Sequence, residues 1–395
     1  MFDLQQTVME KFDTLEEVFR FVSEEKKHVA RLPLKEFWES GARFHGDGYL
    51  GIGSNSFGFN PIGFGALNKM VGISDRALLK LEAPELASNV LNDLFGQELS
   101  VSGKASNSDI IIDENAGTVI GIVSRQYLGY SNDAFLRDVL ICLDEDNNGA
   151  LFPTTGDLVF KSAYSINSQL FLRLSTKSVK GVVSGRGGTS DDVSEIGIEA
   201  TNTMAGGHAV RLSSYVFRLI CANGLVAQVS GSTGRVIHTG SNVSFRERIS
   251  SSTNGLLSDL GRTKKMIETL GGIEFAPRQL ARFADLKSLF SIVPNRDLKR
   301  EAFERARGKG YGEHSSEDRK LSRLTDAISQ IPFCLDGVEA RSVFSSYWRD
   351  GATMYDFINV FTEHAKSLPI DQKIKTETNA GALAVWISKN KRRFA

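Results

Sequence analysis

The first clear pattern in the chain is a set of apolar residues at helical spacing near its start. Leu15, Val18 and Val22 follow one another at intervals of three and four residues. This spacing is typical of an amphipathic helix with one buried face. The sequence therefore predicts a helix over residues 13–29, with an Asp or Thr at its start as the N-cap.

Short runs rich in β-branched residues indicate strands in the middle of the chain. Residues 110–112 and 118–123 flank a turn-forming segment, which predicts a hairpin. Further strands are predicted at 157–164, 169–175, 179–183 and 215–220. The alternation in FLRLS, residues 171–175, predicts one face on a core and one face in solvent.

A glycine-rich segment covers residues 41–65, where glycines interleave with Phe44, Phe57, Phe59 and Phe64. Glycine supplies turns and allows close backbone approach. We therefore interpret the segment as a turn-rich layer of aromatic packing. A phosphate-binding loop is the alternative, but the GKS or GKT ending of such loops is missing.

The pattern becomes helical in the rest of the chain. A helix is predicted over 74–95 with a break near Pro84. Beyond about residue 250, helical apolar spacing recurs in segments 256–270, 277–293, 296–310, 316–331 and 353–368. The Ser/Thr/Asn run at 250–254 marks the boundary.

Together these patterns predict the α+β class, with a mainly antiparallel sheet and flanking helices, followed by an α-helical C-terminal region. We expect an α+β domain with Gly-rich loops over residues 1–250. A helical C-terminal domain is expected over 255–395. The hydrophobic content of 41% is enough to build cores for both.

Charge is distributed unevenly, although the formal net charge is zero. From Gly255 onward there are 24 Lys and Arg against 18 Asp and Glu, so the net charge of residues 255–395 is +6. The net charge of residues 1–254 is therefore −6. Such asymmetry indicates that residues 255–395 contact a polyanion. Charged residues within the first 20 positions exclude a secretory signal, and no apolar run is long enough to span a membrane. We expect a soluble protein of the cytoplasm that binds no membrane.

Metal and cysteine chemistry has weak support. Cys142, Cys221 and Cys334 fit neither a disulfide framework nor a metal knuckle, so we expect reduced, mostly buried thiols. The loop DEDNNG at 144–149 matches the start of a calcium loop, but its twelfth position is Thr155 where a Glu is required. A solvated turn is therefore the favoured interpretation, and whether this loop or segment 41–65 binds a ligand stays open.

The histidines are scattered, and none forms an HxH or HxxxH pair. His208 and His238 lie on or beside predicted strands and are the two that the fold is able to bring together. No GxSxG elbow supports a serine triad. We predict no catalytic residue, no metal site and no cofactor.

Basic residues interleaved with aromatic residues are the strongest functional pattern. A sheet that presents arginines and aromatic rings is able to follow a nucleic-acid strand by phosphate contacts and base stacking. The alternative is that the aromatic residues form the core and the arginines a solvated face. The candidate nucleic-acid-binding residues are Arg211, Tyr215, Arg218, Arg235, His238, Arg305, Arg307 and Lys309.

Several segments of the chain resemble a known family, the phage- and plasmid-related domain-of-unknown-function family 932. The similar pieces are RLP (31–33), SRQYLGYSND (124–133), the Gly197 and Asn202 spacing, YVFRLICANGLV (215–226), RVIH (235–238) and YDFINVFTEHA (355–365). The resemblance implies a phage, prophage or plasmid origin and a bacterial host cytoplasm. It transfers no catalytic residue, and Thr203 and Met204 stand where members carry a Ser-Glu pair.

Three hypotheses about function follow. The first is an accessory protein of a mobile element that acts on nucleic acid by binding or annealing single-stranded DNA. The second is a self-assembling structural or anti-defence interaction protein without catalysis, which forms a homo-oligomer. The third is an enzyme that uses His208, His238 and nearby arginines on a phosphate-bearing substrate.

Overall fold

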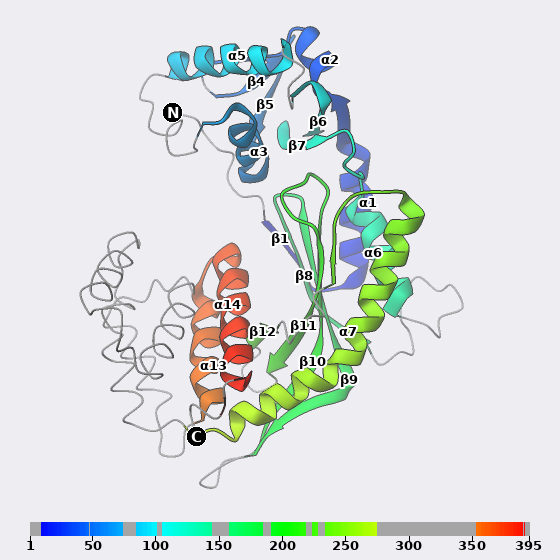
Figure 1. The fold of residues 1–395 in the computed structure, drawn as a ribbon, viewed down its shortest axis with the longest axis vertical. Coiled ribbons are helices and arrows are strands. Elements are labelled where there is room, and N and C mark those ends of the chain that lie inside the picture. Colours follow the sequence, from blue (N-terminus) through cyan, green and yellow to red (C-terminus); the bar gives the residue numbers. More distant parts are fainter. Residues whose placement is uncertain are drawn as a thin grey trace, which may run out of the picture. The chain divides into compact units, whose positions relative to one another are not determined.

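The computed structural model describes residues 9–46, 48–73, 84–100, 105–143, 158–184, 191–218, 223–227, 234–274, 353–389 and 391. Two mainly antiparallel sheets carry flanking helices, and helices follow in the C-terminal part, so the predicted α+β class is confirmed (Figure 1). The chain divides into two compact units. Unit 1 comprises Met1–Leu174, Glu199–Leu212 and Thr233–Leu256, and unit 2 comprises Ser175–Ile198, Ser213–Ser232 and Leu257–Ala395.

One sheet of unit 1 has six strands in the order β2-β6-β7-β5-β4-β3. These are β2 (Val29–Pro33), β6 (Ser108–Asp113), β7 (Thr118–Ser124), β5 (Asn55–Phe59), β4 (Leu50–Ile52) and β3 (Arg43–Phe44). Its neighbours are antiparallel except for the parallel pair of β5 and β7. Strands β6 and β7 form the predicted hairpin around residues 114–117.

The glycine-rich segment builds the aromatic core of this sheet, as the sequence predicts. Phe44, Phe57, Phe59 and Phe64 are all buried in one cluster beneath helices α2 (Leu34–Glu39), α3 (Pro61–Val71) and α5 (Pro84–Ser100). Glycine is required where α3 meets the sheet, because a Cβ on Gly63 would lie 2.3 Å from the carbonyl oxygen of Val119. Helix α5 begins at Pro84, and the earlier part of the predicted 74–95 helix lies outside the described residues.

The other sheet has the order β1-β8-β9-β10-β11-β12, and β13 also pairs with β11. Its strands are β1 (Met9–Phe12), β8 (Leu158–Ile166), β9 (Gln169–Val183), β10 (Asp192–Thr203), β11 (Val210–Arg218), β12 (Asn223–Ala227) and β13 (Gly234–Val236). Strand β9 is continuous where the sequence predicts two strands. Strands β9, β10 and β11 each run through residues of both units.

The interpretation of FLRLS as a strand with one solvent face is wrong. All five residues of 171–175 are buried. Arg173 is only 1% exposed in its side chain, and its Nε donates a 2.8 Å hydrogen bond to the carboxylate of Glu199, which is 6% exposed. A buried charge is tolerated when an opposite charge and hydrogen bonds compensate it, and the partner lies on a strand that the alternation in FLRLS does not reveal.

Helix α1 (Leu15–His28) confirms the first sequence prediction. Thr14 is the N-cap, and with Glu17 it forms a reciprocal capping box. Leu15, Val18 and Val22 are the buried residues of the helix. Helix α6 (Asn132–Leu143) packs beside α1 (Figure 1).

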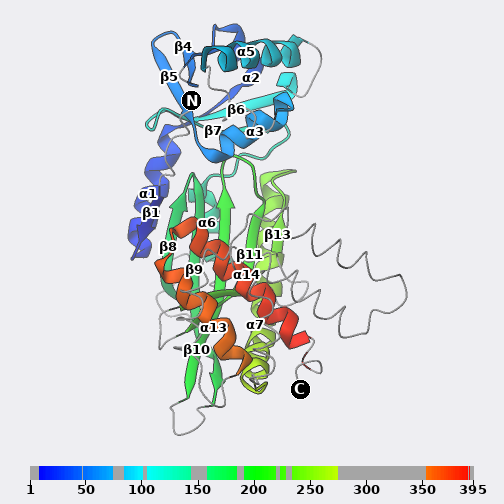
Figure 2. The same ribbon diagram turned by 90° about the vertical axis from the view of Figure 1, so that its left-hand side faces the viewer.

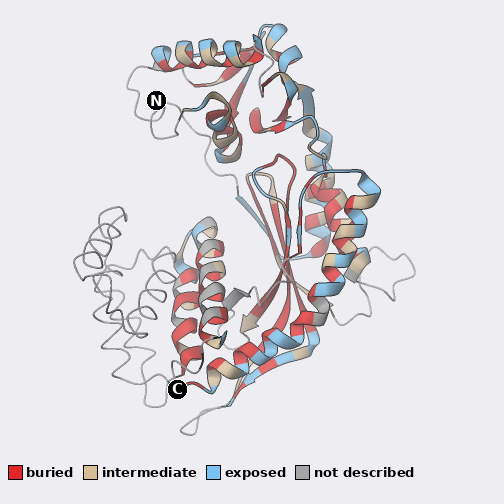
Figure 3. Cartoon of the chain, in the orientation of Figure 1, coloured by how far each residue is buried: buried red, intermediate tan, exposed pale blue. Residues whose placement is uncertain are grey.

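The predicted boundary at 250–254 falls inside the 30-residue helix α7 (Asn242–Gly271). Buried residues recur along one side of α7 (Figure 3), for example Phe245, Ile249 and Leu260. This apolar repeat stabilises a helix through the Ser/Thr/Asn run, since packing overrides weak local propensity. The division into domains 1–250 and 255–395 stays a prediction, because 275–352 lie outside the described residues.

In unit 2, the helices α13 (Met354–His364) and α14 (Ile370–Lys389) pack against each other (Figure 2). Helix α14 also packs on β12. The short 3-10 helix η2 (Ala365–Ser367) joins the two helices, and a second one, η1 (Ala105–Asn107), precedes β6 in unit 1. Among the described helices, none has both the length and the apolar character that crossing a membrane requires.

Candidate functional site

Two of the candidate residues, Arg211 and Arg235, form a pair on the seven-stranded sheet, in the part that belongs to unit 1. They are directly opposite each other in the antiparallel pairing of β11 with β13. Both are exposed, whereas their neighbours Val210, Leu212 and Val236 are buried on the other face. Neither arginine has an ion-pair partner among the described residues. We call these two residues the arginine pair.

A groove of about 1010 Å³ lies near the arginine pair, between α3 and the turn that joins β10 to β11. Lys69 of α3 and His208 of the turn are its basic residues, and it contains no Asp or Glu. Apolar side chains complete the lining, among them Pro61, Ile62, Met70 and Val123. We call this the basic groove.

His208 connects the basic groove to the arginine pair. Its pKa is lowered, first by partial burial and then by the positive charge of Arg211. At neutral pH His208 is therefore mostly uncharged, and Lys69 is the cation of the groove lining. The two arginines add positive charge beside the groove. An anionic ligand at this place would be attracted by three cations without displacing an internal ion pair.

The other described candidates do not join this surface. Arg218 is bound to Asp192 in unit 2, and its guanidinium lies 5.9 Å from the centre of the Tyr355 ring. Tyr215 is 3% exposed and His238 is 2% exposed, so neither presents its ring to a ligand. The predicted base stacking on these rings is therefore not available.

The remaining candidates cannot be placed. Arg305, Arg307 and Lys309 lie outside the described residues, as do the loop 144–149, Cys221 and Cys334. Cys142 is a free, partly buried thiol. No group of three or more His, Cys, Asp or Glu in the described parts of the chain is arranged to hold a metal ion.

Three of the motif segments that carry the family resemblance, 31–33, 124–133 and the one with Asn202, contact one another in unit 1. Arg31 donates hydrogen bonds to the carboxylate of Asp109 at 2.7 Å and to the carbonyl oxygen of Tyr127 at 2.8 Å. Asn202 donates to the carbonyl oxygen of Tyr130 at 3.2 Å. These motif residues therefore hold the segment 124–133 in place, which is a structural role.

His238 belongs to the same interior. Its ring stacks on Tyr127 at a centroid distance of 4.8 Å and is flanked by Tyr130 and Phe245. Burial lowers its pKa to about 4. The ring contacts described for it are with aromatic residues, whereas His208 lines the basic groove. The enzyme hypothesis required these two histidines to work together, and their contacts give it no support.

Sequence reasoning found Arg211 and Arg235 but not their relationship. Their opposition depends on the register of β13 against β11, and the two residues are separated by segments that give no register signal. Lys69 was missed because a single lysine on an amphipathic helix carries no functional pattern. Only the packing of the 204–209 turn against α3, where a Cβ on Gly207 would lie 3.3 Å from Ile62, places Lys69 beside His208.

Comparison of the chain with known proteins gives no match to a protein-family model, a curated protein or a solved structure. The family resemblance therefore stays a prediction.

Proposed function

We propose that this protein is an accessory protein that binds single-stranded nucleic acid, DNA in the first instance, at the arginine pair and the basic groove. The observation that carries the proposal is the arginine pair itself. Like charges directly opposite each other destabilise a sheet. An anion between two guanidinium groups removes that repulsion and gains charge-assisted hydrogen bonds.

The lining of the basic groove favours a single strand over a duplex. Its cations suit phosphate groups, and its apolar side chains suit the face of an unstacked base. The backbone of a duplex presents phosphates and sugars without exposed base faces, so the apolar lining would contribute little to duplex binding. The resemblance to a family of mobile elements supports the same proposal, because replication and transfer of such elements generate single strands.

The test is fluorescence anisotropy with labelled single-stranded and duplex oligonucleotides at salt concentrations from about 50 to 200 mM. We expect tighter binding of the single strand and an affinity that falls linearly on a double-logarithmic plot against salt. The double variant Arg211→Ala/Arg235→Ala should flatten that slope by about 1.4, which corresponds to two lost phosphate contacts on a single strand.

Arg20→Ala is the matched control, because Arg20 is an exposed arginine of unit 1 on α1 without an ion pair among the described residues. It should bind with the wild-type slope. Absence of binding at low salt, or an equal loss in the Arg20→Ala control and the double variant, would contradict the proposal.

A further inference from the structure

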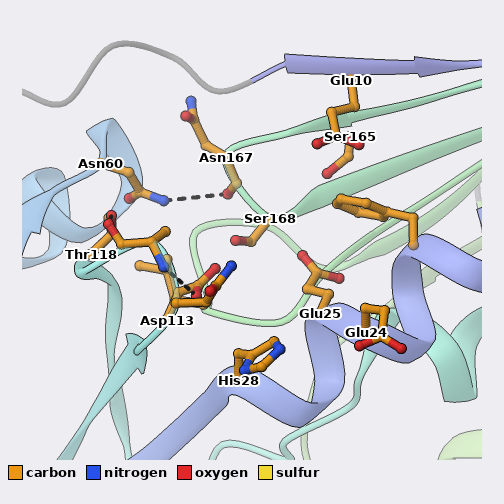
Figure 4. Close-up of a pocket in the computed structure, with 14 residues that line it drawn as sticks. Glu10, Glu24, Glu25, His28, Asn60, Asp113, Thr118, Ser165, Asn167 and Ser168 are labelled. Atoms are coloured by element: carbon orange, nitrogen blue, oxygen red, sulfur yellow. Dashed lines mark hydrogen bonds between the residues drawn. The ribbon is translucent and has the colours of Figure 1, made fainter.

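A second cavity of unit 1, of about 470 Å³, has the opposite charge (Figure 4). Four carboxylic acids contribute to its lining, and no Lys or Arg does. The acids are Glu10, Glu24, Glu25 and Asp113. Phe21, Ala116 and Ile120 supply apolar surface. We call this the acidic cavity.

The cavity is built by elements that are distant in the sequence. Residues 24–28 come from the last turns of α1, Glu10 comes from β1, and Asp113 ends β6. The turn between β8 and β9 reaches the cavity with Asn167 and Ser168, which adopt φ values of 49° and 66°. Two successive residues with positive φ are characteristic of the type I′ hairpin turn.

Glu25 is held in a fixed orientation inside the cavity. The side-chain amide of Asn132, which is fully buried, donates to one Glu25 carboxylate oxygen at 2.9 Å and to the carbonyl oxygen of Ser168 at 3.2 Å. Asn202 in turn donates to the Asn132 side-chain oxygen at 2.9 Å. This chain of amides leaves the second oxygen of Glu25 for a ligand.

Ser165 provides a hydrogen-bonding group that the protein leaves unused. It lies directly opposite Glu10 in the pairing of β1 with β8, and only 5% of it is exposed. Within the described residues its hydroxyl has no hydrogen-bond partner, although it lines the cavity (Figure 4). A serine hydroxyl is both a donor and an acceptor, so this one, which lines the cavity beside Glu10, is a position for a donor from outside the protein.

We propose that the acidic cavity binds a small aliphatic cation with primary amine groups, such as a diamine. Each ammonium group has three donors and no acceptor, which matches a lining of carboxylates and hydroxyls. The hydrocarbon part of the ligand would contact Phe21 and Ile120. A bare metal ion fits less well, since the described acids form no metal-binding group.

Because Glu25 is protonated, the proposal is testable by the release of a proton on binding as well as by the binding affinity. Burial raises its pKa to about 8, and the charges of Asp113 and Glu10 act in the same direction. The other titratable groups that face it are Glu24, which is paired with Lys27 at the surface, and His28. Without ligand, Glu25 is therefore mostly protonated at neutral pH, and a bound ammonium group should displace its proton.

The experiment is isothermal titration calorimetry of the full chain with putrescine at pH 7 in buffers of different ionisation enthalpy. We expect one site per chain and release of most of one proton per ligand. The neutral probe 1,4-butanediol, which has the same length, should not bind. Glu25→Gln should weaken putrescine binding at least tenfold and abolish proton release. Ser165→Ala should lower the affinity for putrescine without abolishing binding.

Glu16→Gln is the matched control, because Glu16 is an exposed residue of α1 outside the cavity. It should bind putrescine as the wild type does. The proposal is overturned if putrescine does not bind, if butanediol binds equally well, or if folded Glu25→Gln and Ser165→Ala both bind with wild-type affinity. A site that takes Mg²⁺ in place of putrescine would overturn it as well. Oligonucleotide binding at the arginine pair is independent of each of these outcomes.

Discussion

The acidic cavity and the arginine pair each gather ionisable side chains that are mainly of one kind, acids in the cavity and bases at the pair. In the cavity, carboxylates surround a space without a basic side chain other than His28. At the arginine pair, two arginines lie opposite each other, and no acid among the described residues forms an ion pair with them. A third place in unit 1 differs from both, because Arg173 and Glu199 form an ion pair with each other inside the protein.

The presence or absence of an ion-pair partner within the protein distinguishes structural charges from charges that are able to bind a ligand. A buried charge with its own partner is satisfied, and a ligand has nothing to add. An uncompensated charge next to a cavity or on an exposed strand costs free energy until a ligand of opposite charge arrives. The following predictions test that separation.

The largest effect is expected at the compensated pair. Glu199→Gln leaves the charge of Arg173 buried without its counter-ion, which should destabilise the fold by about 3 to 5 kcal/mol. The double variant Arg173→Met/Glu199→Leu should recover most of this loss. Urea unfolding of both variants measures the free energies. If the single variant unfolds at the wild-type urea concentration, the pair is not structural and the comparison fails.

Glu25 should give the next largest effect. Its pKa is raised from 4.5 to about 8 in the folded state, so the folded protein binds more protons than the unfolded chain between these values. The contribution of Glu25 to stability is therefore highest below pH 4.5 and falls as pH rises toward 8. Glu25→Gln should remove this loss, gaining about 3 kcal/mol relative to wild type between pH 4.5 and 7.

Urea unfolding at several pH values measures the Glu25 effect, with Glu16→Gln as the control on the same helix. The control should follow the wild-type pH dependence. Parallel curves for wild type and Glu25→Gln would show that the carboxyl is ionised in the folded state, and the acidic cavity would then lack its proton switch.

The contribution of His238 to stability should depend on pH in the opposite direction from that of Glu25. Its pKa is lowered from 6.5 to about 4, so the unfolded chain binds the proton more readily than the folded protein. Its contribution to stability is present above pH 6.5 and is lost as pH falls through 4. His238→Phe keeps an aromatic ring beside Tyr127 and should retain about 3 kcal/mol more stability than wild type at pH 4.

Tyr127→Phe is the control for that measurement. It removes the 2.9 Å hydrogen bond from the Tyr127 hydroxyl to the carbonyl oxygen of Thr203, and no ionisation near neutral pH is involved. Its loss of stability should be the same at pH 7 and pH 4. A His238→Phe curve that stays parallel to wild type would mean that the imidazole reaches solvent.

The smallest effect is expected at the arginine pair. Arg235→Glu converts the like-charge opposition with Arg211 into an attraction, which should stabilise the fold by about 0.2 to 1 kcal/mol. The same change should reduce oligonucleotide binding. Thermal unfolding with Arg20→Glu as the control measures the stability change. A destabilised Arg235→Glu variant would show that the two side chains do not repel each other.

Local patterns were predictable where a single element carries its own signal. The helix with Leu15, Val18 and Val22 was found because one helix face is buried, and the β6–β7 hairpin because turn residues separate two β-branched runs. The aromatic layer in 41–65 was found because large rings at this density need a core. These signals lie within about 20 residues of sequence.

The sites were not predictable in the same way. Glu10, Glu25 and Asp113 gain meaning as a group only where α1, β1 and β6 meet. Tyr215 and His238 were expected to face a ligand, and their rings are buried instead. A strand pattern does not say which of its polar or aromatic residues finds a partner on another strand, as Arg173 and Glu199 also show.

The sequence by itself determined the α+β class, the amphipathic helices, the hairpin and the aromatic packing of the glycine-rich segment, because each depends on residues that are close along the chain. Tertiary structure alone decided which charges are compensated. Opposition across strands depends on register, and a cavity depends on several elements meeting, so neither the arginine pair nor the acidic cavity exists until the sheets are assembled.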